Sequence, residues 1–217
     1  TTRGKHAFGD LIRSVENGEV DILVGTQMVT KGLDFDRVGL VGIMSADNLL
    51  SYPDFRANER AFQLIEQVAG RTGRRTSKGT VVIQAMKPRH SIIQLALNHD
   101  FSGMQAKELT VRQEYQYPPF VRLITITLKH RDQKLLQRAA GEFARSLRSK
   151  IGDRFLGPEF APIARLKNLY QMQIIVKVDK GSVGAKVRER IKKSHQEILL
   201  SPDFNRVRVV FDVDPNS

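Results

Sequence analysis

Two different patterns of apolar residues, one on each side of Pro118 and Pro119, constrain the fold of this chain most strongly. Before the prolines, apolar residues come in short continuous runs, as in strands that are buried on both faces of a parallel sheet. After them, apolar and polar residues alternate, as in strands with one solvent-exposed face. Because proline fits neither a helix interior nor a central strand, a domain boundary is expected close to this pair. The chain is therefore predicted to hold two domains, residues 1–105 and 119–217, joined by a linker at 106–118.

The first domain is predicted to have an α/β fold. Continuous apolar runs at 21–26, 38–44 and 80–86 are expected to form parallel strands. Apolar residues at helical spacing predict helices near 8–15 and 92–96, and a longer helix that ends near Gly70. Three strands make a small sheet, so we expect this domain to be the later part of a lobe whose first strands precede this sequence.

The second domain is predicted to have the element order β-α-β-β-α-β. Alternating residues predict strands at 124–128, 170–178 and 207–213, and LGPEFAPIA (156–164) predicts an extended segment interrupted by proline. Amphipathic spacing predicts helices over 135–147 and 183–198. This order is that of two-layer, ferredoxin-like α+β domains.

The positive charge of the chain is concentrated in its second half. Residues 1–110 hold 14 basic and 12 acidic side chains, whereas residues 111–217 hold 21 and 11. A basic domain usually meets a polyanion, because each neutralised phosphate releases counterions. A cationic surface that only keeps the protein soluble is the alternative.

Several of these cations are expected to contact the phosphates of DNA. Lys186, Arg190 and Lys193 are 4 and 3 residues apart and share one face of a predicted helix. Further cations lie in a turn, Arg165 and Lys167, and on the outward side of the last strand, Arg206 and Arg208. Such a distribution would hold a nucleic acid without reading its sequence.

Composition excludes some classes of site and of protein. The chain has no cysteine, which excludes disulfides and thiolate metal sites and fits a cytoplasmic location. No apolar run approaches the roughly 20 residues of a membrane span. The five histidines are scattered without the spacing of metal ligands, so no metal site is predicted in this chain.

Two stretches carry candidate chemistry. GTQMVTKGLDF (25–35) follows a predicted parallel strand, where α/β folds bind ligands, and its glycines allow backbone amides to approach an anion. QVAGRTGR (67–74) places Arg71 and Arg74 at a helix end, and guanidinium groups suit bidentate contact with phosphate. Taken singly, the first stretch is explained equally well by a loop with turn glycines and capping threonines, and the second is explained better by a solvated basic helix end.

The two stretches together, in this order, resemble motifs V and VI of superfamily 2 helicases. PDFRANER (53–60), YPPF (117–120) and FDVDP (211–215) extend the likeness. With them, nearly the whole chain resembles the PriA, or primosomal protein N′, family of replication-restart DNA helicases. The resemblance implies that residues 1–105 are the C-terminal part of the second RecA-like lobe and that residues 119–217 are the basic C-terminal domain of that family.

The resemblance also implies roles for individual residues. In motif VI, Arg71 and Arg74 would act on the ATP phosphates during hydrolysis, with Gln67 and Gly70 on the nucleotide side. In motif V, the nucleotide-side positions are Gly32 and Asp34, and those that would contact the DNA backbone are Thr26, Gln27 and Thr30. For the arginines and the glutamate of PDFRANER, an internal salt-bridge network is preferred over a functional role. Tyr115, Tyr117 and Tyr170 could stack on bases, but packing is the preferred interpretation.

The cofactors implied by the family are ATP and Mg²⁺, with a zinc module whose cysteines are not in this chain. The chain has neither GxxxxGK[ST] nor a DExH-like box, so we expect it to be inactive as an ATPase by itself. The implied partners are single-stranded and forked DNA, single-stranded-DNA-binding protein and other primosome proteins. Two alternatives stay open: another superfamily 2 DNA translocase, or, for this chain alone, a non-enzymatic module that binds fork DNA or docks single-stranded-DNA-binding protein.

Overall fold

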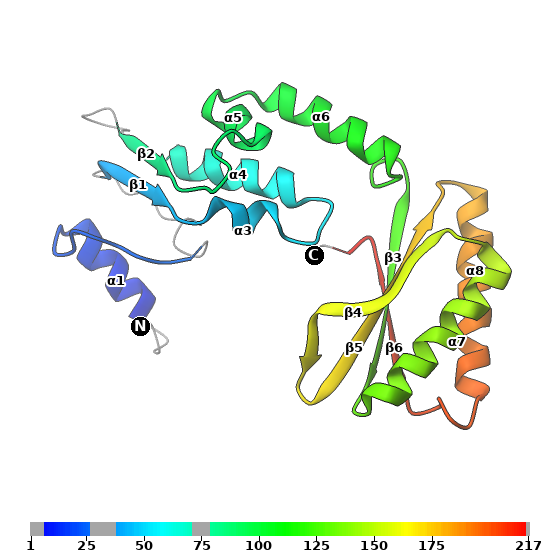
Figure 1. The fold of residues 1–217 in the computed structure, drawn as a ribbon. Helices are drawn as coiled ribbons and strands as arrows, with labels where there is room; N and C mark the ends of the chain where they lie inside the picture. The colour runs from blue at the N-terminus through cyan, green and yellow to red at the C-terminus, as the bar shows by residue number, and fades with distance from the viewer. Residues whose placement is uncertain (1–6, 27–37, 71–78, 216–217) are drawn as a thin grey trace. The chain divides into compact units, whose positions relative to one another are not determined.

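The computed structural model describes residues 7–26, 38–70 and 79–215 (Figure 1). The chain divides into two compact units, Thr1–Glu108 and Leu109–Ser217, and each is described by itself. In the described residues no helix is both long enough and apolar enough to cross a membrane.

The first unit begins with helix α1 (Ala7–Glu16), as the apolar spacing predicts. The helix ends at Asn17 and Gly18, where the Gly18 amide donates to the Val15 carbonyl at 3.1 Å. Gly18 has φ 76°, a left-handed conformation that glycine adopts without the clash of a side chain.

The strand expected at 21–26 is absent, and that prediction is wrong. Residues 21–26 belong to no helix or strand, and the side chains of Ile22 and Val24 are 80% and 84% exposed. An apolar run forms a strand only where a neighbouring strand accepts its hydrogen bonds. Among the described residues of this unit, β1 (Leu40–Ile43) and β2 (Thr80–Ile83) pair only with each other.

Strands β1 and β2 form the predicted parallel pair, from Leu40 opposite Thr80 to Ile43 opposite Ile83. Helices α3 (Ala46–Leu50) and α4 (Ala57–Ala69) lie between them in sequence, and α5 (Ser91–Leu97) follows. The core packs Phe62, Ile65, Ile92 and Ile93 against the strands. Burial on both strand faces was expected but is wrong among the described residues: Leu40 and Val82 are 63% and 51% exposed, because the core cluster that the described residues form lies on one face of the strands.

A further helix, α6 (Phe101–Glu114), occupies a stretch where no element was expected. It includes residues 106–114 of the predicted linker. Its sequence shows no helical spacing of apolar residues, because only Met104 and Glu108 of this helix are buried. Glu108 accepts a hydrogen bond of 2.9 Å from the Asn58 side chain, which satisfies a buried carboxylate.

The second unit has the predicted order β-α-β-β-α-β. Its elements are β3 (Arg122–His130), α7 (Gln133–Ile151), β4 (Phe155–Leu166), β5 (Leu169–Val178), α8 (Ser182–Leu200) and β6 (Arg208–Val213). The sheet has the strand order β4-β5-β3-β6, and every pair is antiparallel. Both helices cover one face of this sheet (Figure 1). The ferredoxin-like prediction is therefore confirmed.

Alternation along the strands decides which side chains face the helices. Ile126, Leu128 and Ile174 are fully buried against Leu136 and Phe143 of α7. The residues between them, such as Thr127 and Lys129, project from the other face of the sheet, because successive side chains of a strand point to opposite sides. The α7 N-terminus is capped by Asp132, whose side chain accepts a 3.0 Å hydrogen bond from the Leu135 amide.

Candidate nucleotide and nucleic-acid interfaces

The C-terminal end of α4 carries the described part of the predicted nucleotide site. The buried face of α4, which includes Phe62 and Ile65, packs into the core and leaves Gln67 and Gly70 exposed at the helix end. The Gly70 amide donates to the Glu66 carbonyl at 2.9 Å, so Gly70 continues the helical turn. Arg71 and Arg74 lie outside the described residues. Gln67 and Gly70 are thus presented on the surface, directly before the two predicted catalytic arginines.

Thr26 is the only predicted motif V contact that the structure describes. It is exposed, at the end of the segment that follows α1. The other motif V positions, Gln27, Thr30, Gly32 and Asp34, lie outside the described residues. Their placement, and any convergence of motifs V and VI on one ligand, stays a prediction.

The three predicted DNA-binding cations of α8 are all exposed. The Arg190 guanidinium donates to the Lys150 carbonyl at 2.9 Å, which caps the last turn of α7 with a positive charge. Lys193 pairs with Glu189 one turn away at 3.2 Å, in an exposed ion pair. For Lys186, no carboxylate partner is found among the described residues. One of five Arg190 donors is therefore used internally, and the rest of this face can meet solvent or an anion.

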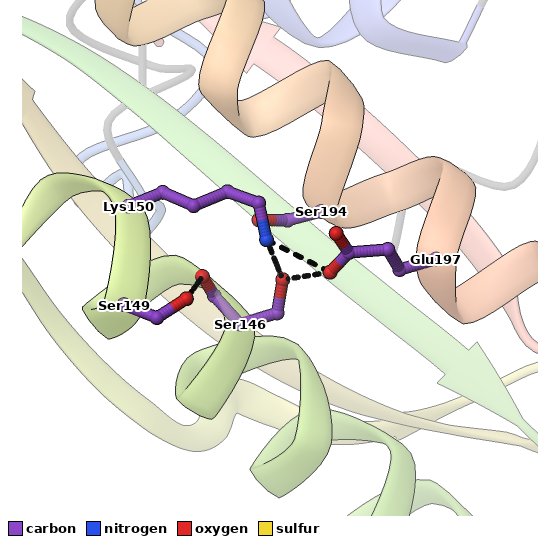
Figure 2. Close-up of polar contacts among 5 residues, drawn as sticks. All are labelled: Ser146, Ser149, Lys150, Ser194 and Glu197. Atoms are coloured by element: carbon purple, nitrogen blue, oxygen red, sulfur yellow. Dashed lines mark hydrogen bonds and ion pairs between the residues drawn. The ribbon is translucent and has the colours of Figure 1, made fainter.

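A polar cluster of Ser146, Lys150, Ser194 and Glu197 fixes α8 against α7. Lys150 Nζ lies 2.8 Å from Glu197 Oε2 and 2.9 Å from Ser146 Oγ. The Ser146 hydroxyl donates to Glu197 Oε2 at 2.6 Å and lies 2.8 Å from the buried Ser194 hydroxyl. Figure 2 shows Ser146 and Lys150 reaching from α7 toward Glu197 on α8. The cluster positions the basic helix, and its sequence signals were the Ser146–Lys150 and Ser194–Glu197 spacings of about one turn.

The electrostatics of this cluster are those of a structural ion pair. The hydrogen bonds from Lys150 and from Ser146 lower the pKa of Glu197 below its ordinary value. Lys150 Nζ is therefore held between the Glu197 carboxylate and the Ser146 hydroxyl. We assign the cluster to helix packing and give it no catalytic role.

Two family models match this chain in tandem. Residues 7–76 match the helicase conserved C-terminal domain, and residues 113–216 match the primosomal protein N C-terminal domain. The chain is 38% identical over 213 residues to the replication restart protein PriA of Bacillus subtilis, covering 94% of this chain and 26% of that protein. It is 38% identical to PriA of Synechocystis sp. over 221 residues, covering 100% of this chain and 25% of the relative.

PriA of Chlamydia pneumoniae is 34% identical over 217 residues, which cover 99% of this chain and 28% of that protein. The chain belongs to the PriA family. It spans about a quarter of the length of these PriA relatives. The predicted fold class agrees with the two matches, a helicase lobe followed by a PriA-type C-terminal domain.

The PriA-family assignment places every predicted site residue within a matched segment. All motif V and VI positions fall within residues 7–76, and the α8 cations fall within 113–216.

PDFRANER, a stretch that carries the PriA resemblance, forms local structure. Arg60 pairs with Asp54 at 2.9 Å, and the Asp54 side chain is only 4% exposed. Asp54 Oδ1 also accepts a 2.9 Å hydrogen bond from the Arg56 amide. The Glu59 carboxylate accepts a 3.2 Å hydrogen bond from Gln63. The stretch thus shapes the entry to α4, in line with the structural interpretation of this motif.

Two of the tyrosines considered for base stacking pack against cations of their own unit. Lys177 Nζ lies 4.3 Å from the Tyr117 ring, and Arg165 lies 5.0 Å from the Tyr170 ring. Tyr170 also packs on the core. Burial lowers the pKa of Lys177, whose ammonium group donates to the Tyr115 carbonyl at 2.6 Å. The preferred packing role is confirmed for Tyr117 and Tyr170, whereas the Tyr115 ring is 56% exposed.

Four histidines lie in the described residues, and each makes a local contact. His90 accepts from the Ile92 amide at 3.3 Å, and His99 lies 3.0 Å from Glu66. His130 accepts from the Asp132 amide at 3.0 Å, and His195 packs edge-on against Phe211. Within the described part of the chain, no three potential ligands from histidine or carboxylate side chains gather into a metal site.

Proposed function

We propose that this chain is part of an ATP-dependent DNA helicase that recognises stalled or branched replication forks and restarts replication through primosome assembly. In this proposal the first unit supplies motif V and VI residues, and the second unit supplies a basic DNA-binding domain. We expect the protein to act in the cytoplasm. The observation that carries the proposal is the tandem of a helicase C-terminal domain and a primosomal protein N C-terminal domain in one chain.

On the nucleotide side, the donor chemistry fits ATP. The exposed Gln67 amide and the two following arginines are hydrogen-bond donors that suit phosphate oxygens. Bound ATP would supply the transferable γ-phosphoryl group together with its Mg²⁺ ion. Arg71 and Arg74 would stabilise charge on that group, an effect typically worth roughly 10³- to 10⁵-fold in rate. Gly70, Gly32 and Asp34 would lie on the same side, and the phosphate loop would come from elsewhere in the protein.

On the DNA side, Thr26, Gln27 and Thr30 would contact the single-stranded backbone. Lys186, Arg190 and Lys193 would hold DNA through its phosphates, which fits recognition of a branched structure rather than a sequence. Single-stranded-DNA-binding protein and other primosome proteins are the partners that we expect. A zinc module would also belong to the whole protein, but its cysteines are not in this chain.

The test uses the whole protein with Arg74→Ala and, as matched control, Arg75→Ala, since we assign no ligand to Arg75. We expect Arg74→Ala to abolish ATP-dependent unwinding while binding to a forked DNA in a gel-shift assay stays within about twofold. Arg75→Ala should retain unwinding. Equal loss of unwinding and of fork binding in the Arg74 variant would contradict the assignment.

For this chain alone, a second candidate is a non-enzymatic nucleic-acid module. The excess of 21 basic over 11 acidic residues in positions 111–217 favours it. Salt-dependent binding of forked DNA by the 217-residue chain, without ATPase activity, would support it. Another superfamily 2 translocase is disfavoured, because residues 113–216 match the primosomal protein N C-terminal domain.

A further inference from the structure

The two ends of the sheet in the second unit differ in how their cations are paired. At one end, Arg122 at the start of β3 pairs with Asp214 after β6. At the same end, Arg154 before β4 pairs with Asp179 after β5 at 2.6 Å. Both ion pairs link segments that are far apart in sequence, so the charges of Arg122 and Arg154 are neutralised within the fold.

The opposite end of the sheet gathers cations from three segments. The end of β3, the tip of the β4–β5 hairpin and the start of β6 meet there, at the lower end of this unit in Figure 1. We call this group the basic sheet end; its members are Lys129, Arg131, Arg165, Lys167, Arg206 and Arg208. In the described part of the chain, none of the six has a carboxylate partner.

The strand register places two of these cations directly opposite each other. Lys129 of β3 is the cross-strand partner of Arg208 of β6. Like charges at opposed positions lie about 4.5–5.5 Å apart at their Cβ atoms and destabilise the strand pair. On the other side of Lys129, the neighbour on β5 is Gln171, an uncharged side chain whose amide donates to the Ile163 carbonyl at 3.3 Å.

The carboxylates nearest in sequence do not relieve this repulsion. Asp132 is engaged as the cap of α7, where its side chain accepts from the Leu135 amide at 3.0 Å. Asp203 lies in the connection between α8 and β6, and Asp212 lies on β6 opposite Thr125. None of these three carboxylates forms an ion pair with Lys129 or Arg208 in the described residues. An anion from outside the unit would therefore be stabilised between the two cations.

The hairpin tip adds cations in a fixed geometry. Lys167 and Asn168 form a tight turn with φ 48° and 63°, which puts Lys167 at the end of the hairpin. Arg165 is held by its hydrogen bond of 3.1 Å to Asn168 and by its position 5.0 Å from the Tyr170 ring. A guanidinium group held in this way loses less conformational entropy when it binds phosphate.

We propose that the basic sheet end binds the phosphate backbone of nucleic acid, with the Lys129–Arg208 pair holding a phosphate between its two charges. This inference rests on the proposed function and adds a second phosphate-binding surface to the face of α8. The favoured ligand is nucleic acid because the site spreads six cations over three segments, as suits a row of phosphates. An acidic protein segment is the alternative ligand that the test separates.

The experiment measures binding of a labelled oligothymidine single strand to the 217-residue chain over a series of salt concentrations. The test variant is Lys129→Gln with Arg208→Gln. The matched control is Arg145→Gln with Lys180→Gln, which removes the same charge from exposed sites away from this end. We expect the slope of log affinity against log salt to fall by about 0.7 in the test variant, since the pair holds one phosphate and each single-strand phosphate contact contributes about 0.7. The control should stay close to the wild-type slope.

Two further measurements separate binding from folding. The test variant should melt at a higher temperature than the wild type at low salt, because a like-charge cross-strand pair is removed. Lys129→Arg with Arg208→Lys should keep the wild-type slope, because it keeps both charges. A slope that is unchanged in the test variant, or reduced equally in the control, overturns the inference.

The remaining outcomes are also decisive. If polyglutamate binding is lost in the test variant while DNA binding is unchanged, the site is for an acidic protein segment and the inference is wrong. If the wild-type chain binds no nucleic acid at all, the DNA-binding part of the proposed function fails first. If the wild-type chain binds the oligonucleotide and the test variant binds it equally well, the sheet-end site is contradicted. The DNA-binding part of the proposed function is then unaffected.

Discussion

Lys150 and Glu197 join the two long helices of the second unit, with Lys150 Nζ 2.8 Å from Glu197 Oε2. The buried Ser194 hydroxyl, 2.8 Å from Ser146 Oγ, lies beside this ion pair. Because α8 also carries three of the proposed DNA-binding cations, the polar cluster sets the position of that surface relative to the sheet. Its loss should therefore affect the stability of the unit first and DNA binding second.

Ser194→Ala is expected to lower the free energy of unfolding by about 0.5–1.5 kcal/mol, the usual net contribution of a hydrogen bond, because Ser146 loses a buried partner. Chemical denaturation measures the change. Ser149→Ala is the control on α7: its hydroxyl is exposed and donates only to the Ser146 carbonyl, so its effect should be within about 0.5 kcal/mol. A Ser194→Ala variant as stable as wild type would show that the cluster does not hold the helices.

The same cluster predicts a dependence of stability on pH. Hydrogen bonds from Lys150 and Ser146 lower the pKa of Glu197 in the folded chain. A carboxylate with a lowered folded pKa binds fewer protons in the folded state, so it stabilises the fold above the unfolded pKa of about 4.3. That contribution is lost as the pH falls through the lower folded pKa.

Glu197→Gln should therefore destabilise the chain near neutral pH, and its difference from wild type should shrink as the pH falls below about 4. Thermal melts between pH 3 and pH 7 measure this difference. Glu189→Gln, at an exposed ion pair on the same helix, should differ little from wild type in its melting temperature near neutral pH. A Glu197→Gln difference that stays constant with pH would contradict the assigned cause.

Asp54→Ala tests the structural role of PDFRANER. The Asp54 side chain is 4% exposed, pairs with Arg60 and accepts a hydrogen bond from the Arg56 amide. Its removal takes this acceptor from both donors. We expect a loss of about 1–3 kcal/mol in unfolding free energy. Asp54→Asn should lose less, because an amide oxygen can still accept from the Arg56 amide. Loss of ATPase activity in the whole protein without any change in stability would show instead that the motif acts in function.

The sequence predicts an element well where burial on one face repeats along it. Strands β3 and β5 alternate because Ile126 and Ile174 pack on helices while their neighbours do not. The run at 21–26 is equally apolar but forms no strand, since composition indicates burial and does not supply a hydrogen-bonding neighbour. Helix α6 was not predicted, because it buries only Met104 and Glu108 and its sequence therefore shows no helical period of apolar residues.

The candidate sites also differ in whether the sequence alone can reveal them. Motifs V and VI are visible in the sequence because their residues are contiguous. The Lys129–Arg208 pair joins positions that only the strand register brings together, so no sequence spacing reveals it. Likewise, the use of Arg190 as a cap for α7 depends on how the two helices pack.

Two glycines of the second unit give opposite predictions for the same substitution. Gly157 lies in β4 with φ 91°, and an added Cβ would lie 2.6 Å from the Gln173 carbonyl oxygen. Gly157→Ala should therefore lower the free energy of unfolding by at least about 1–2 kcal/mol, since both the backbone conformation and the close contact oppose a side chain.

Gly141 lies within α7, and an added Cβ would meet no atom within 4 Å. Gly141→Ala should raise the stability by about 0.5–1 kcal/mol through the higher helix propensity of alanine. Denaturant melts of both variants measure the changes. A stabilising Gly157→Ala would contradict the pairing of β4 with β5 at this position, whereas a destabilising Gly141→Ala would contradict the open environment on α7.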